Sequence, residues 1–156
     1  LIGGPQIMKG YLKMPEKTAE VIELIDGYRW YRTGDKGHLD EDGFLIIVDR
    51  YSRFAKIGGE MISLTTVEEE ILEACNDKDL EIAVTCLPDQ RKGEKIVLLA
   101  TNNLDKNKLK NILSDAKVNP LYHPSQVLVV EEIPKLGSGK TDFGATKKIA
   151  LVNEQK

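Results

Sequence analysis

The stretch Trp30–Glu60, WYRTGDKGHLDEDGFLIIVDRYSRFAKIGGE, determines how the rest of the chain is interpreted. It holds five glycines among charged side chains and one apolar run, Phe44–Val48. Glycine permits positive φ and close approach of the backbone, and the apolar run is long enough for one strand. The stretch is therefore predicted to form a turn, a buried strand and a second glycine turn. Because binding residues gather on loops supported by regular elements, we expect binding chemistry here.

Composition and charge limit the classes of function. The chain has 156 residues, of which 41% are hydrophobic and 30% charged, and its formal net charge is −3. These values are typical of a globular protein and argue against nucleic-acid binding, which favours a basic excess. Cys75 and Cys86 lie among apolar residues without metal-ligand spacing, so we expect reduced core thiols, no metal site and a cytoplasmic protein. The first residue is Leu1 rather than Met, so we expect a piece of a longer polypeptide.

The first third of the chain is predicted to contain a helix and a hairpin. A helix is expected over PEKTAEVIEL, residues 15–24, because proline and glutamate both favour the first helical turn. Asp26-Gly27 is expected to end it. Tyr28–Tyr31 and Phe44–Val48 have strand composition, and the turn Asp40–Gly43 precedes the second of them. These two strands are predicted to form a hairpin.

From residue 52 onward the pattern predicts a hairpin followed by α, β, β, α, β and α elements. Gly58-Gly59 forms the turn of this hairpin. Two overlapping capping boxes, Thr65 with Glu68 and Thr66 with Glu69, are predicted to start the first helix. The other expected elements are strands at 82–87, 95–101 and 127–130 and helices at 109–116 and 145–152. The predicted fold class is α+β, with a mainly antiparallel three-stranded sheet and helices.

Two constellations near the opening stretch could bind a ligand, and each has a structural alternative. The two oxygens of Asp35 match the vicinal hydroxyls of a ribose, although a turn aspartate also bonds to its own backbone. Arg50 and Arg53 offer fixed donors to hydroxyl or phosphate oxygens, or form ion pairs in a solvated linker. Gly58-Gly59 either admits a ligand against bare backbone or is only a turn.

The basic loop near the carboxyl end carries the third constellation. Gly137–Thr141 resembles the end of a phosphate-binding P-loop, but the first required glycine would fall at Pro134, so the spacing excludes that motif. Lys140 beside flexible glycines can still neutralise phosphate charge in a transition state; the alternative is a solvated loop. His38 and His123 have no partner at ligand spacing, so structural or solvent-facing roles are expected for both.

The order of these motifs resembles the carboxyl-terminal third of the ANL adenylate-forming enzymes. That family comprises acyl-CoA synthetases, nonribosomal peptide adenylation domains and luciferases. The motifs are, in order, GYLKMPEKTAE, WYRTGDKGHLDEDGF, DRYSRFAKIGGEMISLTTVEEEI, the strand pair around PDQRKGE, and IPKLGSGKT. Within the family, SRFAKIGGEM and PKLGSGKTDF look most like the acyl-acyl carrier protein synthetase domain found with 2-acylglycerophosphoethanolamine acyltransferases. The resemblance implies that residues 1–51 end a large N-terminal domain and that 52–156 form a small mobile C-terminal lid domain.

The resemblance also implies a role for each matching residue. Asp35 and Arg50 would bind the ribose of ATP or of the acyl-adenylate. Lys140 would bridge the reacting carboxylate and the α-phosphate during adenylation. Gly58 and Gly59 would line the passage of a phosphopantetheine thiol in the second step. The family's hinge, commonly Asp or Lys, lies two residues beyond the arginine and is a serine here, residue 52.

The function implied is that of an AMP-forming acid–thiol ligase acting on a fatty acid or another carboxylic acid. ATP and Mg²⁺ would be bound mainly by the N-terminal domain, and the acceptor would be the phosphopantetheine thiol of acyl carrier protein or CoA. The chain alone is expected to be inactive, and membrane contact is expected only through an acyltransferase half of the whole protein. The alternatives are an acyl-CoA synthetase, an amino-acid adenylation domain, and a noncatalytic α+β interaction module whose glycine loops are only turns.

Overall fold

The computed structural model describes residues 1–101 and 104–154, which fall into two compact units. The N-terminal unit is Leu1–Ser52 and the C-terminal unit is Arg53–Lys156. The boundary expected from the sequence, after residue 51, lies one residue before this division. A short 3-10 helix, η1 (Tyr51–Arg53), contains the division.

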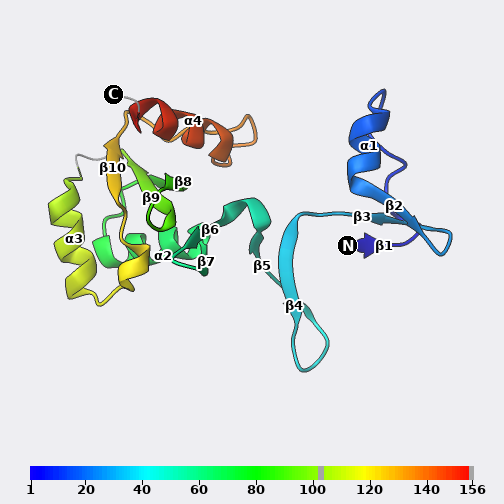
Figure 1. Ribbon diagram of the computed structural model, residues 1–156, viewed down its shortest axis with the longest axis horizontal. Helices are drawn as coiled ribbons and strands as arrows, with labels where there is room; N and C mark the ends of the chain where they lie inside the picture. Colours follow the sequence, from blue (N-terminus) through cyan, green and yellow to red (C-terminus); the bar gives the residue numbers. More distant parts are fainter. Residues whose placement is uncertain (102–103, 155–156) are drawn as a thin grey trace. The chain divides into compact units, whose positions relative to one another are not determined.

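The N-terminal unit contains a small antiparallel sheet beside one helix. Its strand order is β1-β3-β2, with β1 at Ile2–Gly3, β3 at Tyr28–Tyr31 and β2 at Ile22–Ile25, and the helix is α1 (Pro15–Val21) (Figure 1). The predicted helix over residues 15–24 is therefore too long, because its last residues pair with β3. Asp26 and Gly27 have φ values of 50° and 78°. Positive φ at both residues is the requirement of a tight two-residue hairpin turn, so Asp26-Gly27 joins two strands instead of ending a helix.

The second part of this unit is the hairpin of β4 (Asp35–Leu39) and β5 (Leu45–Arg50). Asp40 closes its turn, since Oδ1 accepts hydrogen bonds from the backbone N–H groups of Asp42 (3.0 Å) and Phe44 (2.8 Å). The predicted pairing of Phe44–Val48 with β3 is wrong, because β5 pairs with β4. The predicted burial of this apolar run is also wrong: its side chains are 43–70% exposed. A two-stranded sheet has no second layer to cover them.

The C-terminal unit is built on a five-stranded sheet. The strands are β6 (Phe54–Ile57), β7 (Glu60–Ser63), β8 (Ile82–Asp89), β9 (Gly93–Ala100) and β10 (Gln126–Val129). Their order is β10-β9-β6-β7, and β8 pairs with β9. The expected three strands are present, and the β6–β7 hairpin joins them through a bridge between Ile57 and Gly93. All recorded pairs in this sheet are antiparallel except β10 with β9. The α+β class is confirmed.

Helices cover both faces of this sheet. The helices α2 (Leu64–Cys75) and α3 (Lys106–Asp115) pack on one face, and α4 (Phe143–Glu154) packs on the other. Figure 1 shows β8, β9 and β10 between α3 and α4. The alternation of β8 produces the two cores, because successive side chains of a strand point to opposite faces. Val84 and Cys86 belong to the α2–α3 side, whereas Ala83 and Leu87 belong to the α4 side.

The start of α2 differs from the prediction. Ser63 is the N-cap, and its hydroxyl accepts a hydrogen bond from the Thr66 backbone N–H at 3.2 Å. The two predicted capping boxes are therefore wrong: the helix begins earlier, and the Glu68 carboxylate accepts hydrogen bonds from Val84 N–H and Arg53 instead. The predicted end near residue 76 is confirmed, since Asn76 has the left-handed conformation common at helix ends.

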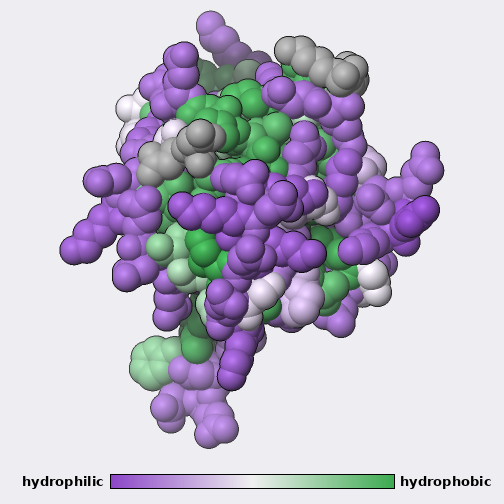
Figure 2. Space-filling view, turned by 90° about the vertical axis from the view of Figure 1, so that its left-hand side faces the viewer, coloured by the Kyte–Doolittle hydropathy of each residue, from purple (hydrophilic) through white to green (hydrophobic). Residues whose placement is uncertain are grey.

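The surface of the α3 side is mainly hydrophilic, with hydrophobic residues visible between the hydrophilic ones (Figure 2).

A second 3-10 helix, η2 (Pro120–Tyr122), connects α3 to β10. Within the two described ranges, no helix has the length and apolar character needed to cross a membrane.

Candidate functional site

The β4–β5 hairpin places Asp35 opposite Arg50, the two residues predicted to bind ribose. Arg50 Nε lies 3.2 Å from Asp35 Oδ1, so the carboxylate and the guanidinium form an ion pair. The backbone of the preceding turn is also fixed. The Asp35 N–H donates to Thr33 Oγ1 at 3.1 Å, and the Gly34 carbonyl accepts from the Tyr51 N–H at 2.8 Å. Thr33 is a site component that the sequence interpretation did not single out.

A cavity of about 370 Å³ opens beside this ion pair, and its lining includes Thr33, Gly34, Asp35 and Tyr51. The Asp35 side chain is 27% exposed and that of Arg50 is 70% exposed. Asp35 thus lines the cavity, and the side chain of its partner Arg50 stays accessible to solvent while the two are paired. A carboxylate with accessible oxygens accepts hydroxyl hydrogen bonds, and the neighbouring guanidinium donates to oxygen atoms. The volume lies in the range of small-molecule sites.

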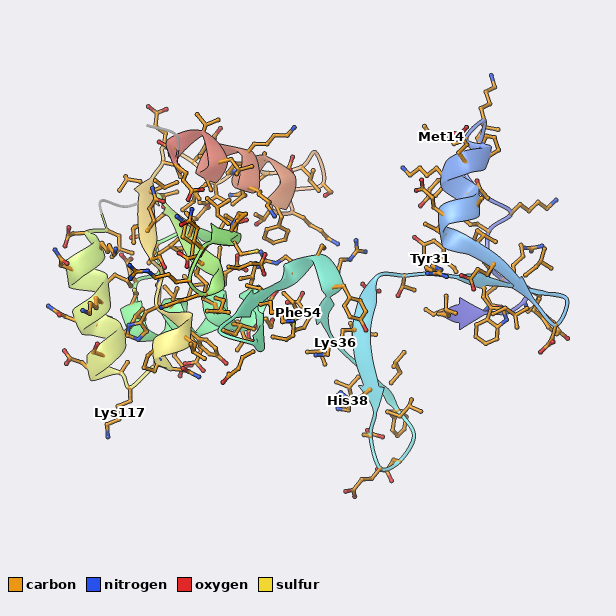
Figure 3. All side chains as sticks on the ribbon, viewed as in Figure 1. Met14, Tyr31, Lys36, His38, Phe54 and Lys117 are labelled. Carbon is orange, nitrogen blue, oxygen red and sulfur yellow. The ribbon has the colours of Figure 1, made fainter. Side chains whose placement is uncertain are left out.

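Two tyrosines adjoin this cluster and were not predicted. Tyr31, at the end of β3 (Figure 3), shares a side-chain hydrogen bond with Tyr11 that raises the pKa of Tyr31 above its ordinary value. The charge of Arg50 acts on the same phenol in the opposite direction, and that of Asp35 raises its pKa further. Tyr31 is therefore a protonated, neutral donor near neutral pH. The two tyrosines are far apart in the sequence, so no local spacing could have joined them.

Gly58 and Gly59 form the turn between β6 and β7. Their φ values are 60° and 94°, so the turn requires residues that tolerate positive φ. A Cβ atom added at either position would meet nothing within 4 Å, which shows that the turn faces open space. A cavity of about 490 Å³ lies beside it, lined by Lys56, Gly59, Lys92, Gly93 and Glu94. This geometry fits a hairpin turn and also leaves room for a narrow chain over bare backbone.

Lys140 lies on a short hairpin within the predicted basic loop. Lys135 and Thr141 form an antiparallel β-bridge. Between them, the Leu136 N–H donates to the Lys140 carbonyl at 2.7 Å, and the Gly139 N–H donates to the Leu136 carbonyl at 2.8 Å. The backbone is thus ordered by its own hydrogen bonds, while the Lys140 side chain is exposed. The arrangement is a β-turn hairpin rather than a phosphate-cradling loop.

Of the two roles left open for Arg53, ligand donor or ion-paired residue of a solvated linker, the structure shows an ion pair, but one that is buried rather than solvated. Arg53 is only 5% exposed, and its guanidinium donates to the Val84 carbonyl (2.7 Å) and to Glu68 Oε2 (2.6 Å). A guanidinium used in this way inside the fold is not available to a ligand. Ser52, the predicted hinge, is exposed and lies at the division between the two units.

The predicted site residues fall into two groups. Asp35 and Arg50 are in contact in the N-terminal unit, whereas Gly58, Gly59 and Lys140 belong to the C-terminal unit. Across residues 1–101 and 104–154, no cluster of three or more His, Cys, Asp or Glu side chains could hold a metal ion. His38 is exposed on β4 (Figure 3), and a ring nitrogen of His123 lies 3.2 Å from the Val118 carbonyl.

The chain is similar to ligases over most of its length, although no protein-family model matches it. The chain is 37% identical over 150 residues to a 2-succinylbenzoate–CoA ligase of Listeria monocytogenes, covering 95% of the chain and 31% of the relative. It is 35% identical over 144 residues to a long-chain-fatty-acid–CoA ligase of Bacillus subtilis, covering 90% and 24%. Crystalline ATP-bound MatB from Rhodopseudomonas palustris is similar in structure, with a TM-score of 0.73, 26% identity and coverage of 94% and 29%.

The chain therefore spans about a third or less of the length of the curated relatives it matches. The similarity lies in their carboxyl-terminal part. The α+β arrangement of this chain matches a small C-terminal domain of ANL enzymes. The homologues of this chain are AMP-forming acyl- and aryl-CoA ligases of the ANL superfamily.

Proposed function

We propose that this chain is the carboxyl-terminal part of an ATP-dependent acid–thiol ligase and supplies a lysine for adenylation. The observation that carries the proposal is the exposed Lys140 on an ordered hairpin, in a chain 37% identical to a CoA ligase. In adenylation a carboxylate oxygen attacks the α-phosphorus of ATP and pyrophosphate leaves. Two anionic groups approach each other, so a cationic side chain at the junction lowers the barrier.

In this proposal the N-terminal unit binds the ribose. The Asp35 carboxylate accepts hydrogen bonds from the two ribose hydroxyls, and Arg50 holds that carboxylate through the 3.2 Å ion pair while donating to a ribose oxygen. No cluster of acidic side chains in the described ranges fits Mg²⁺. We assign the ion and the phosphates of ATP mainly to the preceding domain of the intact ligase, as the family resemblance implies.

The exposed apolar side chains on both faces of β5 support the view that a larger domain precedes and covers this segment. Leu45, Ile46, Ile47 and Val48 are 43–57% exposed on an isolated two-stranded sheet. Such a sheet is only marginally stable in water unless a further layer buries its apolar side chains. We assign residues 1–51 to the end of that domain and 52–156 to a lid that rotates at Ser52. The isolated chain is then expected to show no adenylating activity with ATP and a fatty acid.

The second step uses the open turn of the C-terminal unit. A thiolate attacks the acyl carbonyl of the adenylate, the acyl–phosphate bond breaks, and AMP leaves with its electron pair. Gly58 and Gly59, with open space at both Cβ positions, let the narrow phosphopantetheine arm pass against the backbone. We propose a fatty acid as the acyl donor and acyl carrier protein as the carrier of the thiol, with an associated lysophospholipid acyltransferase in the same protein.

A second candidate is an acyl-CoA synthetase, because the two ligase relatives named above are CoA ligases. Measuring thioester formation by the intact ligase with holo-acyl carrier protein and with CoA separates the two. A higher kcat/KM with the carrier protein supports the first candidate, and a higher value with CoA supports the second. A noncatalytic module predicts no thioester with either.

The adenylating role is tested by Lys140→Ala in the intact ligase, with Lys148→Ala as the control. Lys148 is also exposed but lies within α4. ATP–pyrophosphate exchange is expected to fall about 100- to 1,000-fold in the first variant, which is the usual loss for one group that stabilises developing charge. The control is expected to remain near the original rate. Unchanged exchange in Lys140→Ala would overturn the proposed role.

A further inference from the structure

The C-terminal unit contains a buried charged cluster that the proposed function does not use. Arg53 Nη1 donates to the Val84 carbonyl at 2.7 Å, and Arg53 Nη2 donates to Glu68 Oε2 at 2.6 Å. The other oxygen of Glu68 accepts the Val84 N–H at 2.7 Å. One ion pair thus satisfies both backbone groups of a β8 residue and ties β8 to α2 and to the start of β6. Hydrogen bonds of this kind between buried groups hold neighbouring elements in one arrangement.

The same guanidinium also contacts α4. Its Cζ atom lies 3.7 Å from the centre of the Phe143 ring, the distance of a stacked cation–π contact. Arg53 Nε is buried without a hydrogen-bond partner, which costs free energy, so the other contacts of the guanidinium must offset this cost. Lysine could form the ion pair with Glu68 but has no planar group to stack on a ring.

Phe143 is the first residue of α4 and follows Lys140 by three residues. The connection between them is short and ordered. The Asp142 N–H donates to the Pro134 carbonyl at 2.8 Å, and Asp142 Oδ1 accepts the Ala145 N–H at 2.9 Å. The base of the Lys140 hairpin is therefore attached to the beginning of α4, whose first side chain rests on Arg53. A displacement of Phe143 would move the lysine hairpin.

We propose that Arg53, through its stack on Phe143, is a positioning residue for Lys140 in the adenylation step. Arg53 is the first residue of the C-terminal unit and directly follows Ser52. A backbone rotation at Ser52 would thus carry the Lys140 hairpin with it, without slack between the rotating segment and the hairpin. This inference rests on the proposed function, because it requires Lys140 to act in adenylation.

The test uses three variants of the intact ligase: Phe143→Leu, Phe143→Tyr and Arg53→Lys. Leucine keeps an apolar side chain but removes the ring, tyrosine keeps the ring, and lysine keeps the charge for Glu68 but removes the stacking plane. For Phe143→Leu and Arg53→Lys, kcat for adenylation is expected to fall about tenfold, since small misplacement of a catalytic group is costly. KM for ATP and thioester formation from preformed acyl-adenylate are expected to stay unchanged. Phe143→Tyr is expected to retain the original kcat.

The outcomes separate this inference from the proposed function, with Lys140→Ala as the reference. If Lys140→Ala leaves adenylation unchanged, the proposed function fails and the positioning role fails with it. If Lys140→Ala lowers adenylation but Phe143→Leu does not, only the positioning role is overturned. Equal losses in both half-reactions for Phe143→Leu, or a loss in Phe143→Tyr as large as in Phe143→Leu, would indicate a general structural role and would also overturn it.

Discussion

Replacing Glu68 with alanine should lower the free energy of unfolding of the C-terminal unit more than any substitution of a surface residue. Glu68 has a side chain that is 17% exposed, and it pairs with Arg53, whose side chain is 6% exposed. The substitution leaves a buried guanidinium without its counterion and the Val84 N–H without its acceptor. Removing one partner of a buried ion pair costs about 3–5 kcal/mol. Because Glu68 retains some contact with water, we expect the lower end, about 3 kcal/mol.

Urea unfolding of the chain, followed by far-UV circular dichroism, measures this loss. The three long helices, α2, α3 and α4, all lie in the C-terminal unit, so the helical signal mainly reports that unit. With a slope of about 1.5–2 kcal/mol per molar urea, the midpoint should fall by about 1.5–2 M. Fluorescence of the single tryptophan, Trp30, reports the other unit and should not follow this shift.

The matched control is Glu69→Ala, the exposed neighbour on the same helix. Its free energy of unfolding should change by no more than about 0.5 kcal/mol. A loss below about 1 kcal/mol for Glu68→Ala would mean that the Arg53–Glu68 pair does not hold β8 to α2, because surface ion pairs are worth that little.

Three further predictions concern other parts of the chain. Burial and a hydrogen bond to Glu94 raise the pKa of Cys86 to about 11, so its stabilising contribution should be complete below about pH 9 and decline as the pH rises towards about 11. The free energy of unfolding of Cys86→Ala should accordingly fall less over that pH range than that of the original chain; an equal fall would contradict the raised pKa of Cys86. Ile71→Ala, at a side chain with no exposed area in the α2–α3 core, should cost about 2–5 kcal/mol in urea unfolding, and a loss under about 1 kcal/mol would show that this core is loosely packed. In hydrogen exchange of the isolated chain, the β4–β5 amides should exchange much faster than those of β8 and β9, because no layer covers that hairpin; equal protection would contradict the proposed covering by a larger domain.

The sequence predicted those elements whose signals are local and repeated. The β-branched-rich apolar runs of β8 and β9 and the face of α2 made by Val67 and Ile71 identify the α+β core, since the residues that these signals select are buried there. Turns were predicted less well. Asp26-Gly27 was predicted to end a helix but joins two strands, and only the pairing of β2 with β3 reveals this. Ser63, the N-cap of α2, was missed because Thr65 and Thr66 each precede a glutamate by three residues, which is the capping-box pattern.

The candidate site was predicted in part, and the missing parts depend on contacts between distant residues. Asp35 and Arg50 were assigned to one ligand, and the β4–β5 register brings them together. For Arg53 a ligand donor and an ion-paired residue of a solvated linker both stayed open, because a segment of charged residues gives no sign that one of them is buried. Its partners, Glu68, Val84 and Phe143, come from three separate elements. No pattern within a single segment could have joined them.

We propose that one small unit serves two chemical steps with different residues, and separate measurement of the two steps in two variants tests this proposal. The two half-reactions, adenylate formation from ATP and thioester formation from preformed acyl-adenylate, are measured separately in intact Lys140→Ala and Gly59→Asn ligases. Lys140→Ala should lose about 100-fold or more in adenylation only. Gly59→Asn should lose thioester formation only, because asparagine is among the side chains that tolerate positive φ and its side chain enters the open space beside the turn. Parallel losses in both half-reactions for each variant, or no loss in either, would contradict the claim.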